Sequence, residues 1–67
     1  MRVNQIVVFG TELKLPQPME EEEVKKNLIS ILRDIKPELA EQVENTEYSI
    51  AVQDSKLIIY RLAASFG

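Results

Sequence analysis

The side chains able to do chemistry are few, and most of them are carboxylates. The 67-residue chain contains no histidine and no cysteine, which excludes Ser-His and Cys-His catalysis, disulfides and most zinc sites. The densest reactive set is the acidic run Glu20 to Glu23, and a second candidate is the carboxylate of the last residue, Gly67. We therefore expect no enzyme and no resident cofactor, but a small interaction or carrier module.

The acidic run allows two interpretations. Adjacent residues of a helix point in different directions, so four consecutive carboxylates do not converge on one metal ion. In a first helical turn they lie at the positive end of the helix dipole, where each contributes roughly 0.3–1 kcal/mol when exposed. The run therefore favours a helix start over a metal site or an acidic docking patch.

The last residues are small or uncharged and follow an apolar stretch. Leu57 to Tyr60 runs without a polar interruption, which is typical of a central strand covered on both faces. The segment 63–67, Ala-Ala-Ser-Phe-Gly, comes after it. One hypothesis is a flexible tail whose Gly67 carboxylate is the working group. The other is a frayed terminus without a function, since terminal residues are often poorly ordered.

Composition and charge narrow the class of protein. Sixty-seven residues make one domain, near the lower limit of chain length at which a hydrophobic core is stable without disulfides or a structural metal. The net charge of −3 disfavours a nucleic-acid surface. No apolar stretch approaches the ~20 residues of a membrane span, and the start, Met1 to Asn4, is unlike a signal peptide. The absence of cysteine fits a reducing compartment, so we expect a cytoplasmic protein with no nucleic-acid or membrane partner.

The hydrophobic pattern predicts an α+β domain. Its elements are a strand over 2–9, a short strand over 12–15 stopped by Pro16 and Pro18, a helix that Pro18 or the acidic run opens and that ends near 35–36, a short helix over 37–43, and strands over 48–52 and 57–62. The near-continuous apolar content of the first and last strands predicts that they are central and parallel. This is a β-grasp arrangement over residues 1–62, with residues 63–67 as a flexible tail. A ferredoxin-like half would need another helix, for which residues 53–56 are too few.

The sheet face away from the long helix is a candidate docking surface. If Ile58 and Tyr60 face the helix, then Leu57 and Ile59 are half exposed and form a docking patch with Arg61. In the alternative, Leu57 and Ile59 pack under the segment 37–43.

Short motifs along nearly the whole chain resemble those of ubiquitin-like proteins. They are Val8-Phe9 before a turn, Leu15-Pro16-Gln17-Pro18 after the hairpin, Glu22-Glu23-Val24 at the helix start, Pro37-Glu38-Leu39-Ala40 after it, and the terminal Gly67. In this order they resemble the small bacterial ubiquitin-like proteins called PRTRC system protein C. They are also similar to the modifiers of bacterial ubiquitination-like operons.

The resemblance implies a protein modifier. An adenylating enzyme of the ubiquitin-activating type would use ATP and magnesium to activate the Gly67 carboxylate, and a conjugating-enzyme-like protein would pass it to target proteins, forming an isopeptide bond. Ala64 and Ser65 keep the tail slim, and Phe66 is either a lone exposed side chain or an anchor in the enzyme's pocket. If precursors carry residues beyond Gly67, a processing peptidase is a further partner.

Two alternatives remain within the same resemblance. Ubiquitin and the bacterial sulfur carriers end in Gly-Gly, whereas this chain has Phe66-Gly67. A sulfur carrier would bear a thiocarboxylate at Gly67, and the departure from Gly-Gly weakens that interpretation. A non-covalent adaptor would instead bind its partner through the sheet face and would not need Gly67.

Overall fold

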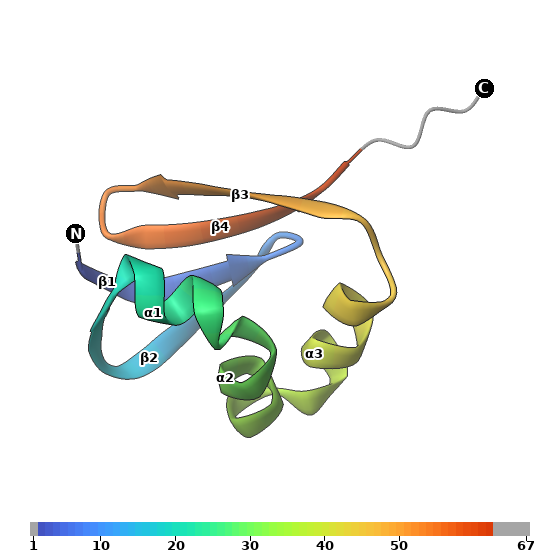
Figure 1. Ribbon diagram of the computed structural model, residues 1–67, viewed down its shortest axis with the longest axis horizontal. Coiled ribbons are helices and arrows are strands. Elements are labelled where there is room, and N and C mark those ends of the chain that lie inside the picture. The colour runs from blue at the N-terminus through green and yellow to red at the C-terminus, as the bar shows by residue number, and fades with distance from the viewer. Residues whose placement is uncertain (1, 63–67) are drawn as a thin grey trace.

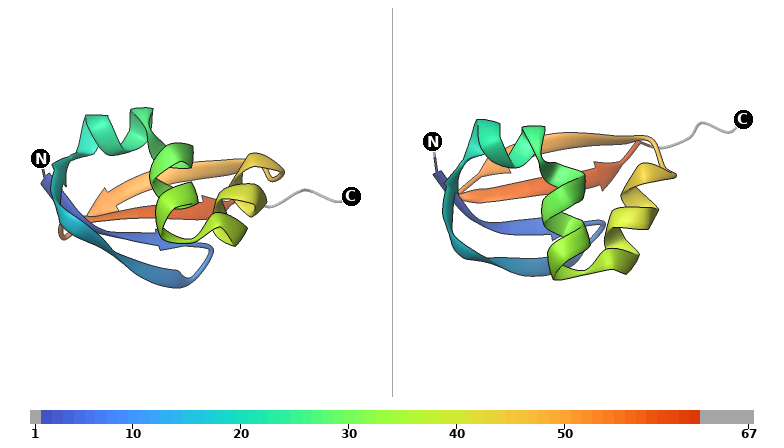
Figure 2. Two further views of the ribbon diagram at one scale, coloured as in Figure 1. Left: turned by 90° about the horizontal axis from the view of Figure 1, so that it is seen from below. Right: turned by 60° about the horizontal axis from the view of Figure 1, so that its bottom comes forward.

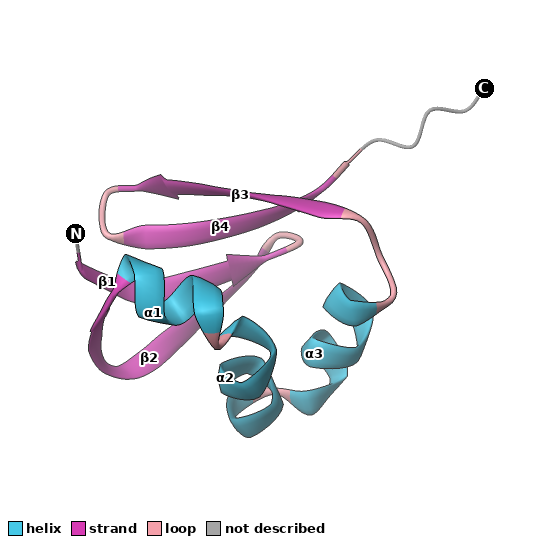
Figure 3. Ribbon diagram, viewed as in Figure 1, coloured by secondary structure: helices cyan, strands magenta, loops and turns pink. Residues whose placement is uncertain are grey.

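The computed structural model describes residues 2–62, which form a four-stranded sheet and three helices (Figure 1, Figure 3). The α+β class expected from the sequence is confirmed. In chain order the elements are β1 (Arg2–Val8), β2 (Thr11–Glu20), α1 (Glu21–Lys26), α2 (Leu28–Ile35), α3 (Pro37–Glu44), β3 (Tyr48–Gln53) and β4 (Lys56–Arg61).

The sheet is mixed, with the strand order β2-β1-β4-β3. The inner strands β1 and β4 run parallel, and Val7 lies opposite Ile58. Both outer strands run antiparallel to their neighbours. Both views in Figure 2 place α1, α2 and α3 on the same side of the sheet. One sheet face therefore carries the helices, and the other is bare among the described residues.

The second strand is longer than the sequence pattern predicts. Pro16 and Pro18 were expected to stop it or to open the helix, but β2 continues to Glu20. Between the pairs Val3–Met19 and Gln5–Lys14, β2 has residues 15–18 where β1 has only Asn4. Both prolines lie in this bulge on an edge strand, where a missing N–H removes no ladder hydrogen bond. The prediction was wrong because the bulge depends on the pairing of β2 with β1, which the pattern within residues 12–20 does not reveal.

The helical segment is interrupted at Asn27. The pattern predicts one continuous helix, but α1 ends at Lys26 and α2 begins at Leu28. Asn27 has φ −111° and ψ 25°. Its side-chain Nδ2 and its backbone N–H both donate to the Glu23 carbonyl, at 3.1 and 3.0 Å. Asparagine competes for backbone hydrogen bonds in this way, which makes it a weak helix former.

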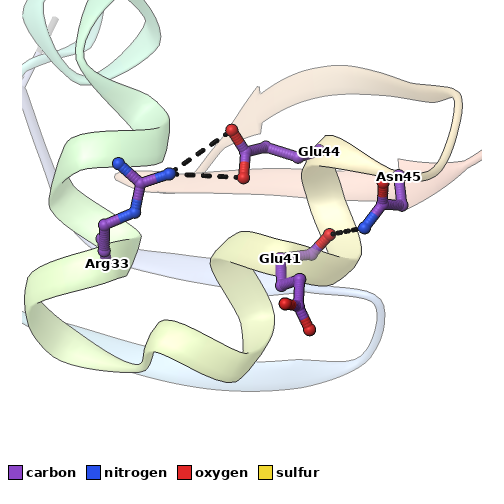
Figure 4. A network of polar contacts seen from close by, with 4 residues as sticks. All are labelled: Arg33, Glu41, Glu44 and Asn45. Carbon is purple, nitrogen blue, oxygen red and sulfur yellow. Dashed lines mark hydrogen bonds and ion pairs between the residues drawn. The ribbon is translucent and has the colours of Figure 1, made fainter.

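The second and third helices are held together at the surface by an ion pair. Arg33 on α2 donates through Nη2 to both carboxylate oxygens of Glu44 on α3, at 3.3 and 3.4 Å (Figure 4). Proline opens α3, where its missing N–H costs nothing. The Asn45 side chain donates to the Glu41 carbonyl at 3.0 Å and caps the other end. Of these contacts, the exposed Arg33–Glu44 pair is the one that joins the two helices, and buried side chains from both helices pack in the core.

The core fills the space between the sheet and the helices. Ile6 and Val8 from β1 and Leu57 and Ile59 from β4 are at most 1% exposed. The helices complete the cluster with the buried side chains of Val24, Leu28, Leu32, Leu39, Ala40 and Val43. The apolar side chains on one face of the sheet thus form a single layer with those of three short helices.

Two adjacent residues of α2 test this division between the core and the surface. Leu32 is fully buried, so Leu32→Ala is expected to lower the free energy of unfolding by about 2–5 kcal/mol. Arg33→Ala breaks only the exposed ion pair to Glu44 and is expected to cost at most about 1 kcal/mol. Urea denaturation followed by circular dichroism measures both values. Equal losses in the two variants would contradict this packing.

Candidate functional site

Two of the three residues predicted to form a docking patch are buried. Leu57 is 0% exposed and Ile59 1% exposed, so the prediction that they are half exposed is wrong. The hairpin register explains it, because Leu57 lies opposite Val52 and Ile59 opposite Ile50. Opposite residues share a face, and this face carries the helices. Both residues belong to the same core cluster as Leu39 and Val43 of α3, in keeping with the alternative interpretation.

The bare face of the sheet carries the other half of β4. Ile58 lies between Val7 of β1 and Ala51 of β3 in one row across the sheet. Tyr60 is next on this face, and its side chain is 46% exposed. The central strands therefore expose apolar and aromatic surface on the side that no helix covers.

A hollow of about 430 Å³ lies at the end of this apolar row, and its lining includes Val7, Phe9, Ile58, Tyr60 and Arg61. The β1–β2 turn forms one wall. Phe9 and Gly10 have positive φ values of 48° and 90°, and Phe9 N–H donates to the Ile59 carbonyl at 2.9 Å. The turn therefore places the Phe9 ring beside the end of β4.

Arg61 adds a positive charge to the hollow. Its guanidinium carbon is 4.8 Å from the centroid of the Phe9 ring, the geometry of a cation–π contact. Arg61 is exposed, so of the predicted docking residues it is the one on the surface. An apolar floor beside a guanidinium suits an apolar side chain next to a carboxylate or a backbone carbonyl.

The acidic run forms a helix start. Glu20 precedes α1, and Glu21, Glu22 and Glu23 occupy its first turn. Glu21 pairs with Lys25 at 3.1 Å, and Glu20 with Arg2 at 3.4 Å. Within residues 2–62, no three acidic side chains come together in a group that could hold a metal ion. The position of Glu21, Glu22 and Glu23 in the first turn of α1 agrees with the helix-dipole interpretation of the run.

The chain leaves the sheet beside the hollow. The N–H of Leu62 donates to the Glu47 carbonyl at 3.2 Å. The Leu62 side chain is 47% exposed. The predicted tail residues lie outside the described residues; they are Ala64, Ser65, Phe66 and Gly67. The candidate site as described thus consists of the hollow and the end of β4, whose place in the sheet Figure 1 shows.

Sequence reasoning missed Phe9, Ile58 and Tyr60 as members of this surface. A signal for two of them exists in the sequence. In the segment 48–52, Tyr48, Ile50 and Val52 alternate with smaller or polar residues, which marks them as the buried set. A two-residue turn after Gln53 then pairs Val52 with Leu57 and leaves Ile58 and Tyr60 on the opposite face.

Comparisons with known proteins identify no relative. No family model matches the chain, and neither the curated proteins nor the solved structures contain a match. Among the described residues, none of the helices has the length and apolar character needed to cross a membrane.

A pair of charge substitutions tests which face of β4 is exposed. Leu57→Asp places an unpaired carboxylate in the core and is expected to unfold the domain. Tyr60→Asp places the same charge on the bare face and is expected to cost about 1 kcal/mol or less. Circular dichroism and thermal melting measure both. A folded Leu57→Asp variant with an unfolded Tyr60→Asp variant would reverse the assignment of faces.

Proposed function

We propose that this protein is a ubiquitin-like modifier, activated at the Gly67 carboxylate by an adenylating enzyme and conjugated to target proteins. The observation that carries the proposal is the exit of the chain. β4 is an inner strand of the sheet, it ends at Arg61, and an exposed hollow lies beside that end. Because β4 is paired with a strand on each side, the position and direction of its end are fixed.

The architecture supports this proposal. A mixed sheet with parallel inner strands, two antiparallel outer strands and helices on one face is compatible with a β-grasp fold. We assign the chain to the ubiquitin-like form of that fold on the order of its elements and on the resemblance of its motifs.

The proposed chemistry needs a carboxylate that reaches into another protein. Fully extended, the five residues after Leu62 would span at most roughly 17 Å. The Gly67 carboxylate attacks the α-phosphorus of ATP, which forms an acyl adenylate and releases pyrophosphate. A nucleophile on the enzyme or target then displaces AMP. Glycine has no Cβ, so an enzyme can enclose its backbone closely. The modifier supplies the electrophile, and its partner supplies the magnesium site.

The hollow would then be the surface that the partner holds while the tail enters its site. Arg61 and the Phe9 ring are next to the point of exit. Aromatic and arginine side chains contribute most to such contacts. We therefore assign partner binding to Phe9, Tyr60 and Arg61, in place of Leu57 and Ile59.

A non-covalent adaptor is the second candidate function, because the partly exposed Val7 and Ile58 and the exposed Tyr60 could bind a partner without any reaction at Gly67. A sulfur carrier is the third. It would use the same adenylate but would exchange one carboxylate oxygen for sulfur.

Intact mass spectrometry tests the proposal. The full chain is incubated with an adenylating enzyme encoded beside it, with ATP and magnesium, and a chain lacking Gly67 is the matched control. We expect a product whose mass is the sum of the two proteins less one water, and no product from the truncated chain. The Tyr60→Asp variant is expected to reduce the rate at least about tenfold, which corresponds to about 1.4 kcal/mol.

The other outcomes separate the alternatives. A mass increase equal to the difference between sulfur and oxygen, without conjugation, would identify a sulfur carrier. No product with an enzyme shown to be active on another substrate would contradict the modifier hypothesis for that enzyme. If the enzyme still binds both chains and Tyr60→Asp abolishes binding, the adaptor function takes its place. Gln53→Glu, which adds a negative charge to the far end of the same face, controls for charge.

A further inference from the structure

The two edges of the sheet differ in how they are protected. The edge strand β2 contains Pro16 and Pro18, a register shift, and the charged residues Glu12 and Lys14. Prolines, charges and bulges are the features that keep an edge from pairing with another strand. The other edge strand, β3, has the sequence Tyr-Ser-Ile-Ala-Val-Gln, with neither a proline nor a charge. Of the two edge strands in residues 2–62, β3 is therefore the one open to a further strand.

The hydrogen-bonding pattern of β3 shows which backbone groups are available. The Glu47 carbonyl accepts from Leu62, and a two-residue turn, Asp54-Ser55 with φ values of 52° and 63°, joins Gln53 to Lys56. Antiparallel pairs alternate between bonded and non-bonded positions. The odd-numbered residues of β3 therefore bond to β4. The N–H and C=O groups of Tyr48, Ile50 and Val52 point away from the sheet.

The same three residues are partly, but not fully, buried. Tyr48, Ile50 and Val52 pack against the core but remain partly exposed. Their neighbours in the sheet, Leu57 and Ile59, are fully buried. The apolar layer under the helices thus reaches the open edge without being closed there by the described residues. A strand added to β3 would satisfy the backbone and extend this layer.

We propose that a second copy of this chain is that strand, and that two molecules pair antiparallel through β3. A twofold axis perpendicular to the sheet keeps the helices of both copies on one face. Ile50 then lies opposite Ile50 of the other copy, and Tyr48 opposite Val52. Each of these pairs joins residues whose backbone groups point outward, so each exchanges both hydrogen bonds. In this register the outward-pointing backbone groups of the two copies meet, and the helices of both copies lie on the same face of the joined sheet.

The charges fit the same register. Glu47 falls opposite Gln53 of the other copy, on the bare face, in the row that continues to Lys56. No two like charges lie opposite each other within the paired segment, and the acidic end of one β3 approaches the basic start of the other β4.

The prolines of β2 leave the outer edges of the pair unable to extend it. The contact is isologous and stops at two copies.

Sedimentation equilibrium of the full chain tests the proposal. One strand pair is a small interface, so we expect a dissociation constant on the order of 0.1 mM. The mass should rise from 7.7 kDa toward twice that value between about 10 µM and about 1 mM protein. Ile50→Lys puts two like charges at the twofold axis and is expected to hold the mass at 7.7 kDa throughout. Ala51→Lys adds the same charge on the other face of β3 and should still dimerise.

A cross-link tests the register without depending on a charged variant. The chain has no cysteine, so Ile50→Cys can only form a disulfide between copies. In the proposed register the two Cα atoms are about 5.5 Å apart, within disulfide range. Two residues at position 51 would be diagonal neighbours at about 7–8 Å, beyond that range.

In a glutathione buffer, Ile50→Cys is expected to give at least about tenfold more covalent dimer at equilibrium than Ala51→Cys. Residue 51 is the more exposed of the two, so random collision predicts the reverse order. A wild-type chain that remains a monomer at about 1 mM would overturn the proposal, as would equal cross-linking at both positions. Neither measurement involves Gly67 or an activating enzyme, so the result is independent of the proposed conjugation.

Discussion

The parallel pairing of β1 with β4 is the interaction on which the rest of the structure depends. Gln5 lies opposite Lys56 and Val8 opposite Ile59, so nearly the whole chain separates the paired strands. Parallel neighbours cannot be joined by a tight turn and need a long crossover. The chain makes this crossover through β2, the helices α1, α2 and α3, and β3. The buried side chains of the helices pack in one core with those of β1 and β4. The outer strands β2 and β3 each join this inner pair through a tight hairpin.

How much could be predicted from the sequence depends on the range of the interaction involved. The α+β class, the end of the second helix at Ile35 and the buried set of β3 follow from local patterns. The interruption at Asn27 depends on one competing side chain. The extension of β2 through Pro16 depends on a bulge in its pairing with β1. The facing of β4 was mistaken because Leu57 to Tyr60 does not alternate. The alternation in β3 marks Ile50 and Val52 as facing the core. The two-residue turn Asp54-Ser55 then pairs them with Ile59 and Leu57, which shows which residues of β4 face the core.

The candidate site illustrates the same division. The exposed position of Arg61 agrees with its predicted role on the surface, whereas Phe9 joins the site only because the β1–β2 turn and the end of β4 meet. The apolar residues of β4 also fall into two groups, one in the core and one on the bare face. Leu57 and Ile59 stabilise the domain, and Ile58 and Tyr60 remain available for recognition. A single strand therefore connects the stability of the fold to its candidate binding surface.

The parallel arrangement of β1 and β4 also determines how the domain responds to force. Arg2 lies at the start of β1 and Leu62 just past the end of β4, so a pull on these two residues slides the strands along each other. The hydrogen bonds between them are then loaded together in shear, instead of being opened one after another as in a hairpin pulled from its open end. A machine that unfolds proteins by pulling would meet its greatest resistance along this direction. Pulling β3 away from β4 would open the sheet at a much lower force.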